Sequence, residues 1–223
     1  MKRIMFITII LLIGFDGLAE AKSAVDYFNS GVDYGRKGEY DRAIQDFTKA
    51  IQINPKDAEA YNNRGFAYEK KGEYDRAIQD FDKAIQINPK HARAYNNRGF
   101  AYEKNGEYDK AIQDYDKAIQ INPKDARVYN HIAWLYSTCP EPNYRNGTKA
   151  VELAEKAISI EGQSCNVVDT LAAAYAEKGR FGDAVRTQKK TIKLAREEDN
   201  KNIAEYEKRL RSYEQGKPWR EKF

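Results

Sequence analysis

Apolar residues recur along most of this chain at a spacing typical of α-helices. Between residues 74 and 87, six apolar side chains fall at offsets 0, 3, 4, 7, 10 and 11, which places them on one face of a helix. A shorter stripe over residues 61–68 precedes it, with offsets 0, 4 and 7. Gly72 separates the two stripes and Pro89 follows the second, and residues of these types end helices. The pattern predicts two helices joined by a short turn.

This helix pair belongs to a block that repeats at a fixed interval. Residues 58–91 and 92–125 differ at only five of their 34 positions. The same tyrosine returns every 34 residues, at Tyr34, Tyr68, Tyr102 and Tyr136. A unit of this size is too small to bury its own core, so such units stack into a solenoid. Solenoids of paired helices are mostly binding surfaces, and the repeat therefore favours a protein that holds another molecule.

A glycine stands in the middle of the first helix of each early block, at Gly31, Gly65 and Gly99. Glycine in a helix interior lowers helix stability by about 1 kcal/mol relative to alanine. Its recurrence indicates that the two helices of a pair approach so closely here that a side chain would not fit.

Three successive blocks resemble the tetratricopeptide repeat (TPR) family. In the second block the matching positions are Tyr61, Gly65, Tyr68, Gly72, Ala77, Phe81, Ala84 and Pro89, with tyrosine where the family often has tryptophan. In the first they are Tyr27, Gly31, Tyr34, Ala43, Phe47, Ala50 and Pro55, and in the third Tyr95, Gly99, Tyr102, Ala111, Tyr115, Ala118 and Pro123. The resemblance implies an all-α fold, a right-handed superhelical solenoid of antiparallel helix pairs whose concave groove accepts an extended peptide or a helix.

Counting onward predicts five helix pairs and a C-terminal capping helix. Repeat 4 carries a five-residue insertion in its turn, because Tyr136 and Ala150 lie five residues further apart than the equivalent pair in repeat 1. An apolar stripe between Ile203 and Tyr213 then provides the cap that covers the last open face of a stacked array. The expected segments are TPR 1 (24–57), TPR 2 (58–91), TPR 3 (92–125), TPR 4 (126–164), a degenerate TPR 5 (165–198), and a capping helix with a tail (199–223).

The groove is expected on the first helices, one residue beyond the core stripe. Asparagine side chains there both donate to and accept from a peptide backbone, and aromatic rings supply contact area. The candidate partner-binding residues are Asn62, Asn63, Phe66, Asn96, Asn97, Phe100, Asn130 and Trp134. The alternative is that the phenylalanine and tryptophan side chains pack between adjacent repeats.

Two further resemblances bear on the kind of groove. The row of Asn63, Asn97 and His131 resembles the asparagine ladder in the superhelix of O-linked N-acetylglucosamine transferases. Repeats that hold the acidic tails of heat-shock chaperones use a lysine and an asparagine at the positions where this chain has Phe28 and Val32. Because that clamp is absent, a receptor for carboxylate tails is disfavoured.

The first 21 residues differ in composition from the repeats. Two basic residues precede an apolar run over residues 4–13, and Ala19-Glu20-Ala21 fits the small-x-small rule for cleavage. The run is shorter than the roughly 20 residues that span a bilayer. We expect a signal peptide (1–21), cleavage near Ala21, and export to the periplasm or the extracellular space. The alternative is an uncleaved anchor or a hydrophobic tail.

Export would permit a disulfide between Cys139 and Cys165, the only two cysteines. They lie at opposite ends of a helix expected over residues 148–161, which is about 20 Å long. Cα atoms joined by a disulfide lie within about 7 Å of each other. We therefore expect two separate thiols, one of them packed.

The sequence shows no catalytic constellation. Neither His91 nor His131 has metal-ligand spacing to a cysteine or another histidine, and no glycine-rich phosphate loop is present. We expect no enzymatic activity, no metal and no cofactor.

Charge is high but mixed, with 38 basic and 34 acidic residues and a net charge of +4. From Arg186 to Phe223 there are 12 basic and 7 acidic residues, and this local excess of positive charge is compatible with contact with an anionic partner or membrane surface. We favour the alternative, a solvated capping helix. The interleaved acids argue against nucleic-acid binding, which needs a continuous basic stripe.

These features predict a non-catalytic scaffold or adaptor that binds a peptide or helix of an unidentified partner protein, in the cell envelope or outside. The alternative is a glycan- or cell-wall-directed module associated with an envelope enzyme, which would present an open aromatic shelf. A third interpretation is self-assembly through the N-terminal end, which lacks an obvious cap.

Overall fold

The computed structural model describes residues 22–221, and over that range the chain is helical, with no β-strand. Ten α-helices form five antiparallel pairs and an eleventh follows them, which confirms the predicted fold. The pairs are α1 (Ala24–Arg36) with α2 (Tyr40–Ile53), α3 (Ala58–Lys70) with α4 (Tyr74–Ile87), α5 (Ala92–Lys104) with α6 (Tyr108–Ile121), α7 (Ala126–Thr138) with α8 (Gly147–Glu161), and α9 (Cys165–Glu177) with α10 (Phe181–Glu197). The last helix is α11 (Ile203–Glu214). The expected signal peptide (1–21) lies outside the described residues.

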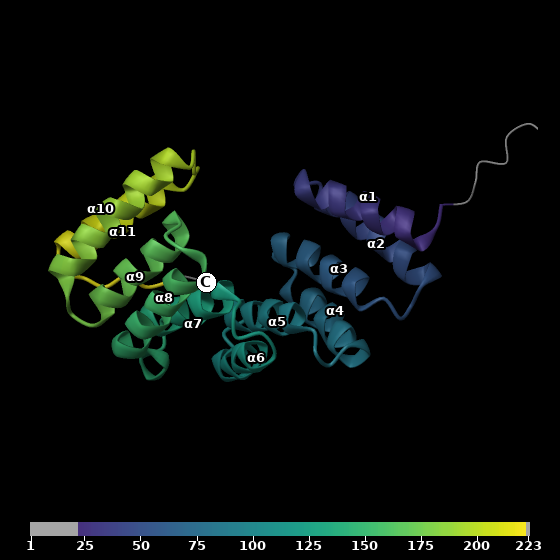
Figure 1. Cartoon of the computed structure of the whole chain (residues 1–223), viewed down its shortest axis with the longest axis horizontal. Coiled ribbons are helices and arrows are strands. Elements are labelled where there is room, and N and C mark those ends of the chain that lie inside the picture. Colours follow the sequence, from purple (N-terminus) through teal and green to yellow (C-terminus); the bar gives the residue numbers. More distant parts are fainter. Residues whose placement is uncertain (1–21, 222–223) are drawn as a thin grey trace, which may run out of the picture.

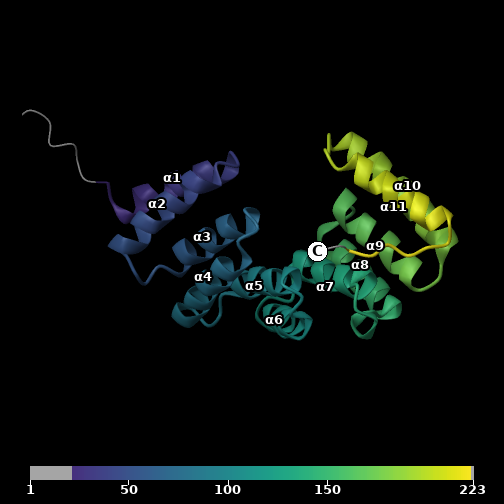
Figure 2. The same ribbon diagram turned by 180° about the vertical axis from the view of Figure 1, so that it is seen from behind.

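The pairs stack into a curved array whose two ends face each other across an opening (Figure 1). α3, α5 and α7 border this opening, while α4 and α6 lie on the outer side (Figure 1). The view from behind shows the same arc (Figure 2). The first helices of the repeats therefore line the concave face, where the groove was expected.

A tight turn joins the two helices of each early repeat. Gly72 adopts a left-handed φ of +77°, which costs glycine little. The turn brings the Glu73 N–H to within 3.0 Å of the Tyr68 carbonyl oxygen, to which it donates. α4 starts two residues after the glycine and runs antiparallel to α3.

The glycine in the middle of each early first helix marks a close approach, as predicted. A Cβ atom added to Gly65 would lie 2.7 Å from Cε1 of Phe81, and Phe81 is fully buried. The pairs Gly31 with Phe47 and Gly99 with Tyr115 have the same arrangement. An aromatic ring of the second helix therefore packs directly on the backbone of the first.

The later repeats keep this geometry with different side chains. At the positions of Gly65 and Phe81, repeat 4 has Ala133 and Ala154, and repeat 5 has Ala172 and Gln188. All four are buried. Where the second helix carries no aromatic ring at this position, the first helix has alanine in place of glycine.

The insertion in repeat 4 forms a 3-10 turn over Pro142–Tyr144. The ring of Tyr144 packs on Tyr108, with 5.1 Å between centroids. The Asn146 N–H then donates to the Tyr136 carbonyl at 2.8 Å, which returns the chain to the start of α8. The extra residues therefore lengthen the turn without displacing the next helix pair.

The last helix covers the end of the array. Tyr206 and Tyr213 of α11 are 3% and 1% exposed. Tyr206 packs in a cluster with Cys165, Ile192 and Ala195 of the fifth repeat. α11 is therefore the capping helix that the last apolar stripe predicted.

Cys139 and Cys165 are both free and both buried, which confirms the prediction of two separate thiols. Cys139 packs in the core of repeats 3 and 4. The Cys165 sulfur accepts from the Asn200 amide at 3.1 Å.

Two features are absent from residues 22–221. No helix of this part of the chain is both long and apolar enough to span a bilayer. Within the same residues, no group of three or more His, Cys, Asp or Glu side chains gathers to form a metal site.

Candidate partner-binding groove

The three predicted aromatic residues each carry a cation over the ring. The Lys70 ammonium lies 4.6 Å from the centroid of Phe66, and the Lys104 ammonium lies 5.2 Å from that of Phe100. Phe66 is 40% exposed, whereas Phe100 and Trp134 are half-buried. The concave face therefore offers aromatic surface with positive charge beside it.

The guanidinium of Arg209 stacks on Trp134, at 4.9 Å from the ring centroid. Lys70, Lys104 and Arg209 are not among the residues predicted for the groove. The spacing of four residues from Phe66 to Lys70, and from Phe100 to Lys104, places each lysine one helical turn beyond its ring and could have revealed them. Arg209 comes from α11, and no sequence spacing links it to Trp134.

Three of the predicted asparagines bond between repeats. The Asn97 amide donates to the Asn62 side-chain oxygen at 3.1 Å, and His131 Nδ1 lies 3.0 Å from the Asn96 oxygen. Asn62 and Asn96 are only 1% and 2% exposed. Contrary to the expected role in binding a peptide backbone, these amides are covered by the next repeat. The short side chain of Asn62 reaches only Asn97 of the next repeat, whereas the longer side chain of Phe66 extends to solvent.

Asn63 and Asn130 remain at the surface of two cavities. Asn63 is half-exposed and donates to the Glu59 carbonyl at 2.8 Å. It borders a mainly apolar cavity of about 190 Å³ between α1 and α3. The lining residues are Val32, Gly35, Arg36, Tyr40, Phe47, Asn63, Phe66 and Ala67. This cavity brings Asn63 and Phe66 together at the N-terminal part of the groove.

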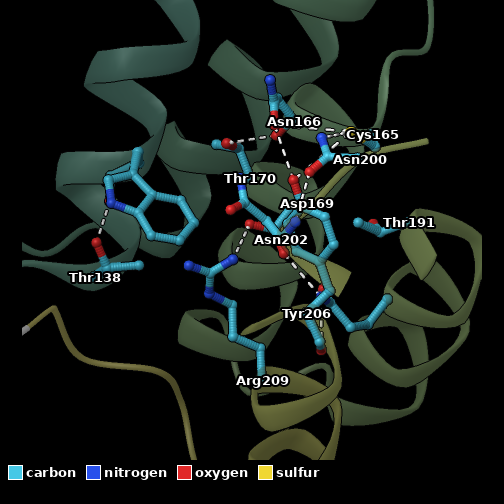
Figure 3. A network of polar contacts seen from close by, with 12 residues as sticks. Thr138, Cys165, Asn166, Asp169, Thr170, Thr191, Asn200, Asn202, Tyr206 and Arg209 are labelled. Carbon is cyan, nitrogen blue, oxygen red and sulfur yellow. Dashed lines mark hydrogen bonds and ion pairs between the residues drawn. The ribbon is translucent and has the colours of Figure 1, made fainter. Parts of the chain in front are cut away.

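Asn130 borders a larger, polar cavity of about 430 Å³ between α7, α9 and α11. Trp134, Asp169 and Arg209 line the same cavity. Arg209 donates to the Asp169 carboxylate at 2.7 Å, and Figure 3 shows this contact between α9 and α11. Gln188 donates to the other Asp169 oxygen at 2.8 Å. Burial raises the pKa of Asp169, although Arg209 opposes the shift.

Two buried ionisable groups lie behind the aromatic row. Burial raises the pKa of the Glu103 carboxyl to about 7, although Lys104 and a hydrogen bond from the Tyr115 hydroxyl lower it. Burial, followed by the positive charge of Arg127, lowers the pKa of the His131 imidazole to about 4. His131 is therefore neutral at pH 7, and its Nδ1–H donates to Asn96.

Replacing His131 with asparagine is expected to make the fold less sensitive to acid. The folded-state pKa of about 4 lies below the ordinary 6.5, so His131 contributes stability above pH 6.5 that is lost as the pH falls toward 4. We expect this loss to be about 2 kcal/mol, less than the full shift implies because water reaches part of the ring. Asparagine keeps the bond to Asn96, as Asn97 bonds to Asn62.

The measurement is the unfolding free energy in urea at pH 7.5 and pH 4.5. His131→Asn should lose about 2 kcal/mol less than the wild type between these values. Equal losses in the two proteins would show that His131 does not contribute to the acid sensitivity.

The C-terminal segment occupies part of the concave face. After α11, Gly216 turns the chain with a φ of +68°, and residues 217–221 run back past α9 toward α7 (Figure 1). The Glu221 N–H donates to the Thr138 carbonyl at 2.9 Å. The Glu221 carboxylate lies 3.3 Å from the Lys104 ammonium of α5. Residues 217–221, here called the tail, therefore cross three successive first helices.

Side chains of the tail also contact this face. The Arg220 guanidinium lies 2.7 Å from Glu177 of α9. Trp219 and Trp134 pack against the same buried cluster of α9, α10 and α11. Arg209 stacks on both rings, at 5.6 Å from the Trp219 centroid and 4.9 Å from that of Trp134. The candidate residue Trp134 is thus in contact with the cation that also holds the tail.

The tail follows one row of equivalent positions. Glu177, Thr138 and Lys104 are the same site in repeats 5, 4 and 3, once the five-residue insertion is allowed for. The row continues as Lys70 and Arg36 in repeats 2 and 1. The position of the tail does not follow from the sequence pattern, because its contacts join residues far apart, such as Lys104 and Glu221, which are 117 positions apart.

The sequence of the repeats matches known families. Residues 58–91 and 92–125 each match the family described as tetratricopeptide repeat, and residues 31–72 match the one described as TPR repeat. A comparison with curated proteins gives no match.

Solved structures with the same architecture include TPR proteins and MamA proteins. A thermophilic TPR protein from Thermus thermophilus has a TM-score of 0.69 and 21% identity, over 86% of this chain and 100% of that chain. A MamA protein has a TM-score of 0.60 and 27% identity, over 82% and 95%. MamA from Desulfovibrio magneticus RS-1 has a TM-score of 0.64 and 23% identity, over 79% and 97%. Residues 31–125 match these repeat families and the helix pairs continue the same arrangement through α10, so the chain contains tetratricopeptide repeats.

Proposed function

We propose that the protein is a non-catalytic scaffold that binds a peptide or helix of a partner protein along its concave face. A TPR fold supports protein–protein interaction in general. The observation that carries the proposal is the tail, an extended segment that already lies on this face. It is held by a main-chain hydrogen bond to Thr138, a hydrogen bond from Arg220 to the Ser137 carbonyl, two ion pairs and a tryptophan ring. A groove that binds one extended segment has the chemistry to bind another.

The part of the face beyond the tail favours a partner with acidic side chains. Lys104 already receives a carboxylate from the tail, and the same row continues as Lys70 and Arg36. Phe66 and the apolar cavity beside it supply contact area in repeats 1 and 2. Opposite charges across an interface fix the position of a bound segment and speed its association.

A glycan-binding module would need an open aromatic shelf. Instead, Arg209 stacks on the Trp134 ring, and Trp219 packs against the same cluster. Lysines lie over Phe66 and Phe100. These contacts favour a peptide over a sugar as the ligand.

We also propose that the protein acts outside the cytoplasm, in the periplasm or beyond the cell. The support is the basic, apolar and small-residue pattern of residues 1–21. N-terminal sequencing of the protein from an envelope fraction should find a mature chain that begins near Lys22. Recovery of an intact Met1 would mean that the segment is not cleaved.

Phe66→Ala is expected to weaken partner binding with little change in stability. The ring is 40% exposed, so its removal leaves no large cavity, whereas a central aromatic anchor in an interface contributes about 2 kcal/mol or more. The partner is first identified by affinity capture from the envelope fraction, with the mature protein as bait. Its affinity for each variant is then measured by titration calorimetry.

Ile53→Ala is the matched control, because Ile53 is 53% exposed but ends a second helix. It should leave the affinity unchanged. Phe100→Ala should lower both affinity and melting temperature, since this ring also packs on His131 at 5.5 Å between centroids. Unchanged partner affinity in both Phe66→Ala and Phe100→Ala would show that the partner does not bind to the concave face.

A further inference from the structure

α11 closes the end of the solenoid together with one residue of the tail. Tyr206 is buried in a cluster with Cys165, Ile192 and Ala195 of the fifth repeat, whereas Tyr213 is buried in a second cluster that Trp219 of the tail also contacts. The chain then reverses at Gly216, where the Lys217 N–H donates to the Ser212 carbonyl at 3.0 Å. From there it runs to the concave face and not outward along the array axis (Figure 1). Its path is that of a bound segment.

The contacts of the tail are those of a reversible ligand. Its ion pairs are partly exposed, with side-chain exposures of 17% and 22% for Lys104 and Glu221, and 32% for Arg220. Water still reaches each pair, so added salt weakens it. One main-chain hydrogen bond joins the tail to α7, at Thr138. Segments with few buried contacts open at a lower free-energy cost than the fold as a whole.

We propose that residues 217–221 are a tethered ligand of the concave face, which competes with a partner segment for the surface of α7 and α9. The tether makes the binding intramolecular, so even a weak site remains occupied. While the tail is bound, a partner has access only to the groove of α1 and α3 and to the part of α5 that Glu221 does not contact. A partner that spans the whole face must displace Trp219 and Glu221. This proposal rests on the proposed function, because it assumes that the concave face is the partner site.

The test uses the full-length protein and a fluorescein-labelled synthetic peptide with the sequence of residues 216–223, GKPWREKF. Anisotropy reports binding of this peptide. The wild-type protein, whose own tail fills the site, should bind it at least about tenfold more weakly than a variant whose tail is released. The release variant is Arg220→Ala/Glu221→Ala, which removes both ion pairs but no core contact. A second variant, Trp219→Ala, removes the ring.

Matched controls separate tail release from general effects. Lys217→Ala changes an exposed charge of the tail without touching these ion pairs, and should behave as the wild type. A peptide with alanine in place of tryptophan should not bind to any of the proteins. Melting temperature checks that each variant folds; if Trp219→Ala unfolds the cap, the ion-pair variant decides the question. Amide hydrogen exchange of the wild-type protein is a second measurement. The Glu221 amide should exchange slowly, because it donates to the Thr138 carbonyl.

Equal peptide binding to the wild type and the release variants would overturn the proposal, as would no binding to a folded release variant. The outcome is independent of the partner experiment. If the Phe66→Ala variant loses the partner but the peptide never binds, the proposed function stands and the tethered ligand is wrong. If the peptide binds only the release variants but the phenylalanine variants keep the partner, the tail is a ligand of this face and the partner binds elsewhere.

Discussion

Phe81→Ala is expected to lower the free energy of unfolding by about 4 kcal/mol, the largest stability effect that we predict for a single residue of the early repeats. Phe81 is fully buried between the two helices of repeat 2. Its loss leaves a cavity against Gly65, where no side chain of α3 can fill the space. Urea unfolding followed by circular dichroism measures the change.

The partner glycine makes the prediction more specific. Gly65→Ala alone should destabilise by about 1–2 kcal/mol, because the overpacking against Phe81 outweighs the gain in helix propensity. In the Phe81→Ala background the same change should stabilise by about 1 kcal/mol, since the methyl group enters the cavity and the helix gains an alanine. The double variant places two alanines where repeat 4 has Ala133 and Ala154.

The neighbouring Phe66→Ala is the matched control for ring removal. Phe66 is one residue from Gly65 but exposed, so its loss should cost less than about 1 kcal/mol. If Gly65→Ala has the same sign in both backgrounds, the two residues are not coupled and the packing argument is wrong.

The fold could be predicted from the sequence because its contacts repeat with the sequence. Gly65 and Phe81 are 16 residues apart and recur with a period of 34 as Gly99 and Tyr115. A close approach inferred in one repeat is therefore tested by the others. The insertion in repeat 4 was also predictable, because the register of apolar positions resumes after it.

The candidate site was only partly predictable, for reasons of geometry. Asn62 and Phe66 lie one helical turn apart on the same face of α3, yet the amide is covered and the ring is exposed. A single-helix pattern cannot show this difference, because it depends on Asn97 of the next repeat. In the row noticed in the sequence, Asn97 and His131 bond to Asn62 and Asn96 of the preceding repeat. Asn63 instead bonds within its own helix.

The remaining contacts in the candidate site come from residues outside the five repeats. Arg209 reaches Trp134 from the capping helix, and Trp219 reaches the same cluster from the tail. Neither residue has an equivalent in another repeat, so the repeat period does not predict its position. Contacts of this kind follow only from the path of the chain after α11.

Glu103→Gln is expected to raise the free energy of unfolding at pH 8 by about 2–3 kcal/mol. The folded-state pKa of about 7 lies above the ordinary 4.5. An acid with a raised pKa contributes stability below pH 4.5 that is lost as the pH rises through 7, because folding then buries a charged carboxylate. Glutamine removes the charge, and its side-chain oxygen still accepts from the Tyr115 hydroxyl.

The pH dependence separates charge from packing in this prediction. At pH 4.5 or below, the glutamine variant and the wild type should agree within about 0.5 kcal/mol, and the difference should grow between pH 5 and pH 8. Glu152→Gln, an exposed acid on α8, is the matched control and should show no such growth. Glu69→Gln should change in the same direction as Glu103→Gln, since burial also raises the pKa of Glu69. A gain in the Glu103 variant that is the same at pH 4.5 and pH 8 would instead mean that glutamine packs better, and that burial of the charge does not limit stability.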